Sequence, residues 1–257
     1  MRAVNSFIEP DYARAFGGIN RLYGANALAR LQQAHVTVVG LGGVGSWAAE
    51  ALVRSGLGRL RLIDLDHVAE SNLNRQAQAL TSTLGQAKVV ALAERLRLIN
   101  PHCQLEYIED FLNANNMASL LDTTSAVLDA IDEVRTKAAL AAYCRNQGLR
   151  LVMCGAAGGK TDASRVRLGD LSLTHNDPLL SKVRAQLRKD YGFPSGQARA
   201  KKMGINAVYV DEPPAAPPMD CMPGTALSCA GYGSAMHVTA TVGLVAVGQL
   251  LNWLTAE

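Results

Sequence analysis

Strand and helix patterns alternate along the first 154 residues of the chain. Continuous apolar or β-branched runs indicate buried strands, whereas apolar residues spaced three or four apart indicate helices. Strands are expected at residues 36–40, 59–64, 104–108, 125–130 and 150–154. Helices are expected before and between them, at residues 26–33, 46–55, 86–99 and 135–147. The alternation predicts an α/β, Rossmann-like, doubly wound and mostly parallel sheet wrapped by helices.

The pattern is weaker elsewhere. Residues 7–24 are expected to be irregular, and a strand is expected at residues 164–168. Asp177 and Pro178 indicate the start of a helix with one apolar and one basic face. We interpret residues 1–257 as a single domain, with a core at about 26–160, a basic and Pro-rich mobile insert at 161–225, and a C-terminal helix at 226–257 that packs on the core.

The C-terminal segment at residues 235–254 contains no charged residue and has the length of a membrane span. It includes His237, Gln249 and Asn252, and neither Lys nor Arg flanks it. Because membrane helices usually carry such cations on one side, a buried helix is favoured over a membrane anchor. Five cysteines without a C-x-x-C pair, and an N-terminal segment without an apolar core, favour a cytoplasmic protein.

Charge is unevenly distributed along the sequence. The 257 residues carry 25 Lys or Arg and 22 Asp or Glu, a formal net charge of +3. Residues 133–202 alone carry 14 cations and 5 acidic residues. Such a block suggests an anionic partner, although a charged helix face is often only solvated. The cations of interest are Lys182, Arg184, Arg188 and Lys189 on one helix face, and Arg199, Lys201 and Lys202 on a following arm.

A glycine-rich loop, Gly40-Leu-Gly42-Gly43-Val-Gly45, follows the first expected strand and opens a helix. Glycines let backbone N–H groups approach a phosphate chain at the positive end of that helix. Asp64 ends the next strand, where a carboxylate can accept hydrogen bonds from ribose hydroxyls. These features match a dinucleotide fingerprint, so an NAD-dependent dehydrogenase is one hypothesis, and a tight turn without a ligand is another.

Three charged residues near the same crevice favour a triphosphate instead. Arg75 follows the second strand, Lys88 begins the next helix, and Asp132 follows the fourth strand. A triphosphate requires cations and a metal ion, and Asp132 could hold magnesium. Arg75 could also be a surface ion pair, Lys88 a solvated residue, and the nearby Asp129 a helix cap. The sequence lacks the G-x-x-x-x-G-K-[ST] motif of P-loop proteins.

Together these motifs resemble the ubiquitin-activating-enzyme-like superfamily. Its bacterial members adenylate carboxylates and include the ThiF and MoeB activators of sulfur carriers and a tRNA-modifying branch. The resemblance to the tRNA branch extends over nearly the whole chain, and the paired C-x-x-C zinc ligands and rhodanese-like domain of the sulfur-carrier activators are not found. The segments that carry it are residues 14–24, 40–51, 64–66, 72–76, 85–88, 129–144, 155–159 and 229–247.

The resemblance implies a role for each motif. The loop of Gly40, Gly42, Gly43 and Gly45 would line the ATP phosphates, and Asp64, Asp66 and Asn74 would complete the nucleotide site. Arg75 and Lys88 would bind the triphosphate, and Asp132 would bind Mg²⁺. Arg21 would reach the triphosphate of a second subunit, which implies a homodimer. Many relatives have Asn after the metal-binding Asp, where this chain has Glu133. The resemblance to the tRNA branch also makes a bound monovalent cation, Na⁺ or K⁺, plausible.

The implied reaction is ATP-dependent dehydration, a cyclisation, of N6-threonylcarbamoyladenosine in the anticodon loop of tRNA, through an acyl-adenylate of the substrate carboxylate. The basic block would bind tRNA, and DNA is not expected as a partner. The alternative is an adenylyltransferase that activates the C-terminus of a sulfur-carrier protein. A third hypothesis is a scaffold for a cysteine desulfurase and its sulfur-acceptor protein. Cys229 and His237 are interpreted as packed residues rather than as a thioester site and a base.

Overall fold

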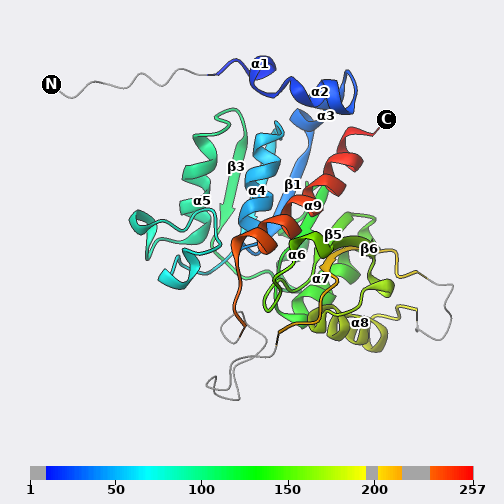
Figure 1. Cartoon of the computed structure of the whole chain (residues 1–257). Coiled ribbons are helices and arrows are strands. Elements are labelled where there is room, and N and C mark those ends of the chain that lie inside the picture. Colours follow the sequence, from blue (N-terminus) through cyan, green and yellow to red (C-terminus); the bar gives the residue numbers. More distant parts are fainter. Residues whose placement is uncertain (1–9, 195–201, 216–231, 257) are drawn as a thin grey trace.

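A seven-stranded sheet forms the centre of the computed structural model (Figure 1), which describes residues 10–194, 202–215 and 232–256. Its strand order is β3-β2-β1-β4-β5-β7-β6. Every neighbouring pair is parallel except β6 and β7, which are antiparallel. The strands are β1 (His35–Val39), β2 (Arg59–Ile63), β3 (Gln104–Ile108), β4 (Ala126–Asp129), β5 (Arg150–Cys154), β6 (Val166–Asp170) and β7 (Asn206–Val210). The expected α/β, mostly parallel fold is therefore confirmed.

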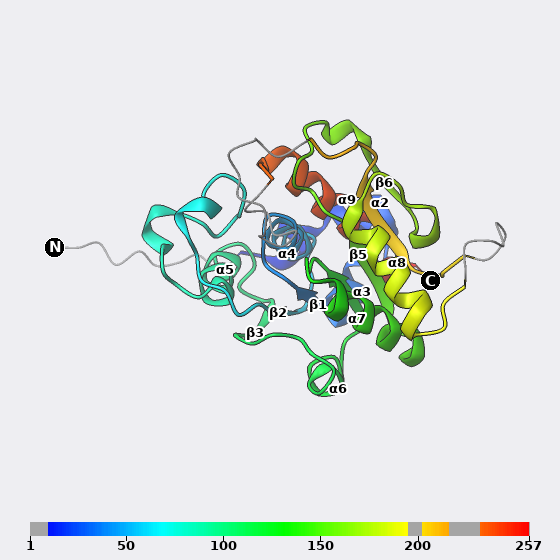
Figure 2. The same ribbon diagram turned by 90° about the horizontal axis from the view of Figure 1, so that it is seen from below.

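Helices cover both faces of the sheet (Figure 2). One apolar core joins the sheet to α4, α5 and α9, and a second core joins its other face to α6, α7 and α8. The strands β1 and β4 are buried along their whole length, as expected for parallel strands covered on both faces. The helices are α1 (Tyr12–Phe16), α2 (Gly18–Tyr23), α3 (Ala27–Gln33), α4 (Gly45–Arg54), α5 (Lys88–Arg97), α6 (Met117–Leu120), α7 (Val134–Gln147), α8 (Pro178–Asp190) and α9 (Met236–Thr255), with 3₁₀ turns at Glu70–Asn72, Thr81–Thr83, Ala163–Arg165 and Leu171–Leu173.

The C-terminal helix α9 lies against the sheet beside α4. By length and composition it is the one helix in the described ranges that could cross a membrane. Its inner side, however, joins the larger apolar core through Val238, Val242, Ala246 and Leu250. Gly243 allows the contact with α4, because a Cβ there would lie 2.5 Å from the carbonyl oxygen of Val44. The helix therefore packs on the core, as expected.

The structure differs from the sequence-based expectations in two regions. Residues 12–23 form the short helices α1 and α2, although the segment was expected to be irregular. Gly17 separates them, and the run is too short to show a helical period. The strand β7, which was not expected, lies between β5 and β6. The described part of the expected insert, residues 161–225, thus supplies β6, α8 and β7 to the main sheet and its covering layer.

The order of the strands also locates the site. The chain moves outward from β1 to β2 and β3, and then crosses back to β4 on the other side of β1. The loops that follow β1 and β4 therefore run in opposite directions from two adjacent strands, at the carboxyl edge of the sheet. Ligands of doubly wound folds bind at such a reversal of strand order.

Candidate active site

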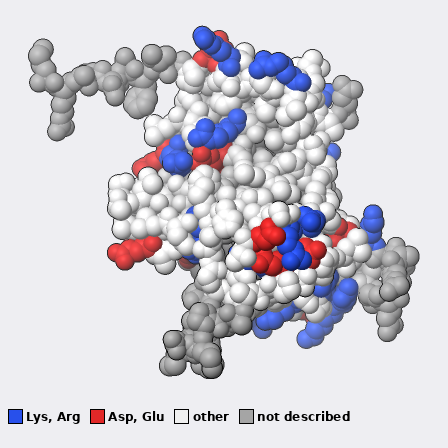
Figure 3. Space-filling view, in the orientation of Figure 1, with Lys and Arg blue, Asp and Glu red and all other residues white. Residues whose placement is uncertain are grey.

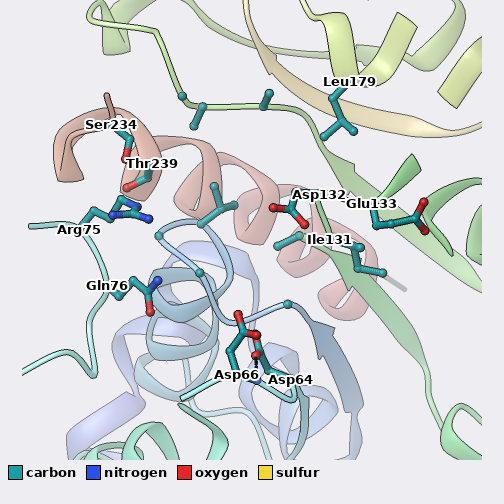
Figure 4. A pocket seen from close by; sticks show the side chains of 18 of the residues that line it. Asp64, Asp66, Arg75, Gln76, Ile131, Asp132, Glu133, Leu179, Ser234 and Thr239 are labelled. Carbon is teal, nitrogen blue, oxygen red and sulfur yellow. Dashed lines mark hydrogen bonds between the residues drawn. The ribbon is translucent and has the colours of Figure 1, made fainter. Parts of the chain in front are cut away.

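A cavity of about 980 Å³ opens at the carboxyl edge of β1, β2, β4 and β5 (Figure 4). The glycine loop forms one part of its wall, and residues 155–158 and Tyr232 form the side farther along the sheet. The sequence-predicted residues that line it are Gly40, Gly42, Gly43, Asp64, Asp66, Asn74, Arg75, Lys88 and Asp132. The structure therefore brings together nine predicted residues from the connections that follow β1, β2 and β4 and from the first residue of α5.

The glycine loop depends on the absence of side chains. Gly40 has φ +86°, and a Cβ there would lie 2.7 Å from the carbonyl oxygen of Ala130. A Cβ at Gly45 would collide with the carbonyl oxygen of Gly40, so Gly45 serves the packing of the first turn of α4 and does not line the cavity. Gly42 has open space around its Cα, and Gly43 lies between Arg75 and Thr239. The N-terminus of α4 is thus presented to the cavity as an anion-binding edge.

Asp64 ties the end of β2 to the glycine loop. Its Oδ2 accepts a hydrogen bond from the backbone N–H of Leu41 at 2.5 Å, and its Oδ1 accepts one from the N–H of Asp66 at 2.8 Å. Burial raises the pKa of Asp64, and the charge of Lys88 and both backbone donors oppose that change. The carboxylate is therefore held in a fixed orientation beside the cavity.

Lys88 and Asp66 form an ion pair at the same edge. Lys88 Nζ lies 2.6 Å from Asp66 Oδ2, and the backbone N–H of Lys88 donates to the carbonyl oxygen of Asp66 at 2.9 Å. The side chain of Lys88 is only 8% exposed, whereas that of Asp66 is 63% exposed. Lys88 is consequently a fixed cation in the cavity wall rather than a solvated residue of α5.

Arg75 points into the cavity from the loop after β2, close to Thr239 and Ser234 (Figure 4). Its Nη1 donates to the carbonyl oxygen of Ser71 at 2.6 Å and to Asn74 Oδ1 at 2.9 Å. Asn74 Nδ2 in turn donates to the carbonyl oxygen of Ser234 at 2.7 Å. Arg75 has no carboxylate partner among the described residues, which argues against the surface ion pair considered above. Asn74 therefore links the guanidinium group to the segment before α9.

Asp132 and Glu133 follow β4 and point in different directions (Figure 4). Asp132 is exposed to the cavity. Both carboxylate oxygens of Glu133 cap α7, accepting hydrogen bonds from the backbone N–H groups of Arg135 at 2.8 Å and Thr136 at 2.6 Å. These donors outweigh the effect of burial and lower the pKa of Glu133. Glu133 thus takes the capping role that was considered for Asp129.

Asp129 instead pairs with a lysine beneath the cavity. Lys137 Nζ lies 2.8 Å from Asp129 Oδ1, and both side chains are fully buried. The ammonium also donates to the carbonyl oxygens of Ile131 at 3.0 Å and Asp129 at 3.3 Å. Sequence reasoning missed Lys137, because a single Lys in a helix is normally solvated. In the sequence, the only indication of a role for Lys137 was its position shortly after Asp132, in a segment that carries the family resemblance.

Lys160 is a second buried lysine that the sequence did not reveal. It lines the cavity, is 3% exposed, and donates to the carbonyl oxygens of Asn176 at 2.6 Å, Val210 at 3.2 Å and Glu212. Burial lowers the pKa of Lys160, and the nearby carboxylate of Asp177 opposes this change. The side chain joins the loop after β5 to the start of α8 and the end of β7, and so it fixes the far wall of the cavity.

Arg21 lies away from this cavity. It is an exposed residue of α2, which lies at the opposite edge of the sheet (Figure 1). Arg21 is absent from the cavity lining, so it can reach a triphosphate only in another copy of the chain. That expectation remains a prediction.

The basic face of α8 divides into two kinds of residue. Arg184 donates to Thr174 Oγ1, and Arg188 Nε donates to the carbonyl oxygen of Pro194 at 3.1 Å, so both are tied to the fold. Lys182 and Lys189 are exposed. Lys202 is also exposed, whereas Arg199 and Lys201 lie outside the described residues.

The remaining candidates add no further group to the site. Cys229 lies outside the described residues. His237, which was expected to be packed, is instead an exposed residue of α9, and its Nε2 lies 2.9 Å from the carbonyl oxygen of Thr161. Across residues 10–194, 202–215 and 232–256, no group of three or more His, Cys, Asp or Glu side chains is placed to hold a metal ion.

The protein-family model described as the ThiF family matches residues 12–257 of the chain. The chain belongs to the ThiF family. It is 45% identical to the tRNA threonylcarbamoyladenosine dehydratase of Haemophilus influenzae over 248 residues, an alignment that covers 95% of this chain and 94% of that protein. It is also 40% identical to the molybdopterin-synthase adenylyltransferase of Salmonella typhimurium over 122 residues, an alignment that covers 48% of this chain and 49% of that protein.

A solved structure is similar over almost the full length. The crystal structure of tRNA N6-threonylcarbamoyladenosine dehydratase, TcdA, of E. coli in complex with ATP superposes with a TM-score of 0.86 at 42% identity. The similarity covers 96% of each chain. The ThiF-family relationship thus includes the sheet, α8 and α9 together, and not only the nucleotide-binding half.

Proposed function

We propose that this chain catalyses the ATP-dependent dehydration of N6-threonylcarbamoyladenosine in the anticodon loop of tRNA. The observation that carries the proposal is the full-length similarity to a dehydratase of that name together with its solved complex with ATP. The half-length match to a molybdopterin-synthase adenylyltransferase supports a common carboxylate-activating chemistry. Since the similarity to the dehydratases extends through α8 and α9, the tRNA reaction is favoured over activation of a sulfur carrier.

The cavity suits a nucleoside triphosphate. A triphosphate carries about four negative charges, which cations and helix N-termini can offset. Arg75 and Lys88 supply two cations, and the N-terminal turn of α4 supplies backbone donors beside Gly42 and Gly43. The fixed carboxylate of Asp64 lies at the end of β2, where it accepts hydrogen bonds from ribose hydroxyls. We assign the adenosine to the β2 side and the reacting carboxylate to the side of residues 155–158.

The reaction consumes ATP as a second substrate. A carboxylate oxygen of the threonyl group attacks the α-phosphorus, and pyrophosphate leaves. An atom of the ureido group then attacks the acyl carbon, AMP leaves with the original carboxylate oxygen, and the ring closes with loss of a proton. The net change is the loss of one water, whose oxygen ends in AMP. Because attacker and electrophile belong to one nucleoside, orientation supplies much of the rate and no protein nucleophile is required.

The chain's part in both steps is to hold charge and geometry. Arg75 and Lys88 stabilise the charge that develops on the phosphate oxygens, an effect that is strong in a preorganised site. Mg²⁺ in nucleotide sites is commonly held by one or two carboxylates with phosphate oxygens and water, and Asp132 offers one such carboxylate at the cavity wall. When bound, the ion neutralises phosphate charge. We assign no residue to a monovalent cation, Na⁺ or K⁺.

Assembly and location belong to the same proposal. A homodimer would bring Arg21 of one chain to the triphosphate in the other, and residues 1–257 would act as one adenylation domain in the cytoplasm. A cysteine desulfurase and its sulfur-acceptor protein are further candidate partners. Neither is needed for the reaction described above.

The test is a reaction with defined substrates. The purified chain is incubated with ATP, Mg²⁺ and tRNA that carries N6-threonylcarbamoyladenosine, and the digested nucleosides are analysed by mass spectrometry. The expected product is lighter than the substrate nucleoside by one water, and AMP and pyrophosphate accumulate with it. Pyrophosphate exchange with a sulfur carrier ending in Gly-Gly, without any change in tRNA, would instead favour the sulfur-carrier reaction.

A further inference from the structure

A groove of about 380 Å³ lies between the N-terminal part of α7 and one face of α8. Residues 133–135 line it from the start of α7, and Lys182, Ala185, Gln186 and Lys189 line it from α8. These four α8 positions are spaced i, i+3, i+4 and i+7, so they form one stripe of the helix. We call this the α7–α8 groove.

The groove is basic, and its lysines are not used by the fold. Its lining holds three cations, Arg135, Lys182 and Lys189, and one carboxylate, Glu133, whose oxygens already cap α7. Among the described parts of the chain, neither lysine ammonium has a hydrogen-bond or ion-pair partner. The opposite stripe of α8, including Leu180, is buried. Figure 3 shows the blue side chains that gather along the lower edge of the molecule, over α8.

Arg135 lies where helix electrostatics disfavour it. The first turn of a helix carries a partial positive charge, so a cation there lowers helix stability unless something else uses it. Arg135 is exposed in the first turn of α7 and faces the same groove as the two lysines. A polyanion bound in the groove would interact favourably with both the side chain and the helix N-terminus.

The groove adjoins the cavity. Glu133 lines both, and in the chain it follows directly after Asp132, which faces the cavity. On α8, Pro178 and Leu179 line the cavity, while Lys182 lies one turn farther along and lines the groove. Figure 4 shows Leu179 and Glu133 on the same side of the cavity. A chain of phosphates in the groove therefore ends beside the opening into the cavity.

We propose that the α7–α8 groove binds the phosphate backbone of the tRNA strand that presents its modified base to the cavity. This inference rests on the proposed function and adds the surface by which the substrate is held. Lysine and arginine contacts to phosphate position RNA without reading its sequence. Arg184 and Arg188, although on the same helix, are tied to Thr174 and Pro194 and support the fold.

The test compares matched charge reversals in the full-length chain. K182E/K189E changes the groove, and R14E/R97E makes the same change in net charge at exposed positions of α1 and α5, at the other edge of the sheet. The affinity for tRNA bearing N6-threonylcarbamoyladenosine is measured by fluorescence anisotropy over a series of KCl concentrations. Thermal melting by circular dichroism checks that each variant is folded, and K182Q/K189Q provides a second groove variant.

K182E/K189E is expected to bind tRNA at least about tenfold more weakly than wild type and R14E/R97E. With two phosphate contacts removed, both groove variants should show a slope of log Kd against log salt that is shallower by about 1.4. Equal affinity and slope in wild type and the groove variants, or an equal loss of affinity in R14E/R97E, would overturn the proposal. If either of these outcomes is found and wild type still dehydrates the nucleoside, only the assignment of the groove fails and the proposed function stands. If wild type neither binds nor modifies tRNA, the proposed function fails.

Discussion

Lys137 and Asp129 form a fully buried ion pair beneath the cavity, with Nζ 2.8 Å from Oδ1. Lys137 also donates to the carbonyl oxygen of Ile131, and Asp129 Oδ1 accepts a hydrogen bond from the N–H of Ile131 at 3.0 Å. The pair therefore fixes the loop between β4 and α7 from below. Asp132 is the next residue of that loop, so the pair sets the position from which the carboxylate faces the cavity.

Removing one member of the pair should cost much stability. K137M leaves the carboxylate of Asp129 buried without its counter-ion, and we expect a loss of about 3–5 kcal/mol in the free energy of unfolding. Urea denaturation measures this loss. The double variant D129L/K137M removes both charges and should recover most of it. Equal stability of K137M and wild type would show that the pair does not hold this loop.

Arg75 should matter for catalysis much more than for stability. R75A removes a cation aimed into the cavity, and we expect the rate of AMP formation to fall about 10²–10³-fold. Its melting temperature should change little, because Arg75 makes no ion pair in the described structure and bonds only nearby loop atoms. R97A, on the outer end of α5, is the matched control and should retain activity. Unchanged activity in R75A would remove this residue from the triphosphate site.

Arg21 allows a test of assembly. If Arg21 acts on the partner subunit's triphosphate, R21A and R75A should each be inactive alone. A refolded equal mixture should regain about a quarter of wild-type activity, because half of the dimers are mixed and each mixed dimer has one intact site. Activity is measured as AMP release with the tRNA substrate. A mixture as inactive as the separate variants, with mixed dimers shown by mass spectrometry, would contradict action across subunits.

Glu50 connects α4 to α5 through two arginines. Its Oε1 accepts from Arg54 Nε at 2.8 Å and its Oε2 from Arg95 Nε at 2.7 Å. Burial alone would raise the pKa of Glu50, but the two guanidinium groups outweigh it and lower the pKa below the ordinary value of 4.5. A carboxyl with a lowered pKa stabilises the fold above its unfolded pKa, and this contribution is lost as pH falls through the folded pKa.

E50Q should therefore be less stable than wild type at neutral pH, by about 1–3 kcal/mol in the free energy of unfolding. The difference should shrink as the pH falls below about 4, where wild-type Glu50 also becomes protonated. Denaturant unfolding of both proteins at neutral and acid pH measures it. A difference that is the same at both pH values would show that shape, and not charge, accounts for the effect.

The sequence was most informative where a feature lies in consecutive residues. The glycine loop combines a turn, a positive φ at Gly40 and a helix start within six residues, so its pattern is visible without the fold. Residues from separate loops, such as Asp64 and Lys88, could be placed at one edge because parallel strands end together. The charges of Arg75 and Lys88 favoured a triphosphate, and the family resemblance then implied the individual roles toward ATP.

Features that depend on distant contacts could not be predicted. The position of β7 between β5 and β6 depends on which strands pair after a long excursion of the chain, and its five residues alone do not specify that order. Lys137 and Lys160 resemble ordinary solvated lysines until the fold surrounds them with carbonyl and carboxylate oxygens. The sequence also could not show which cations of α8 are bonded to the fold and which are exposed, because that depends on where Thr174 and Pro194 lie.

Trp47 gives the protein an internal optical probe. Its indole Nε1 donates to the carbonyl oxygen of Arg75 at 2.8 Å, and the chain has only one other tryptophan, Trp253 near the end of α9. A shift of the Arg75 backbone on nucleotide binding would therefore change the polarity around one indole. In a W253F background, the emission of a single fluorophore would follow the filling and emptying of the cavity during turnover, in real time and without a label.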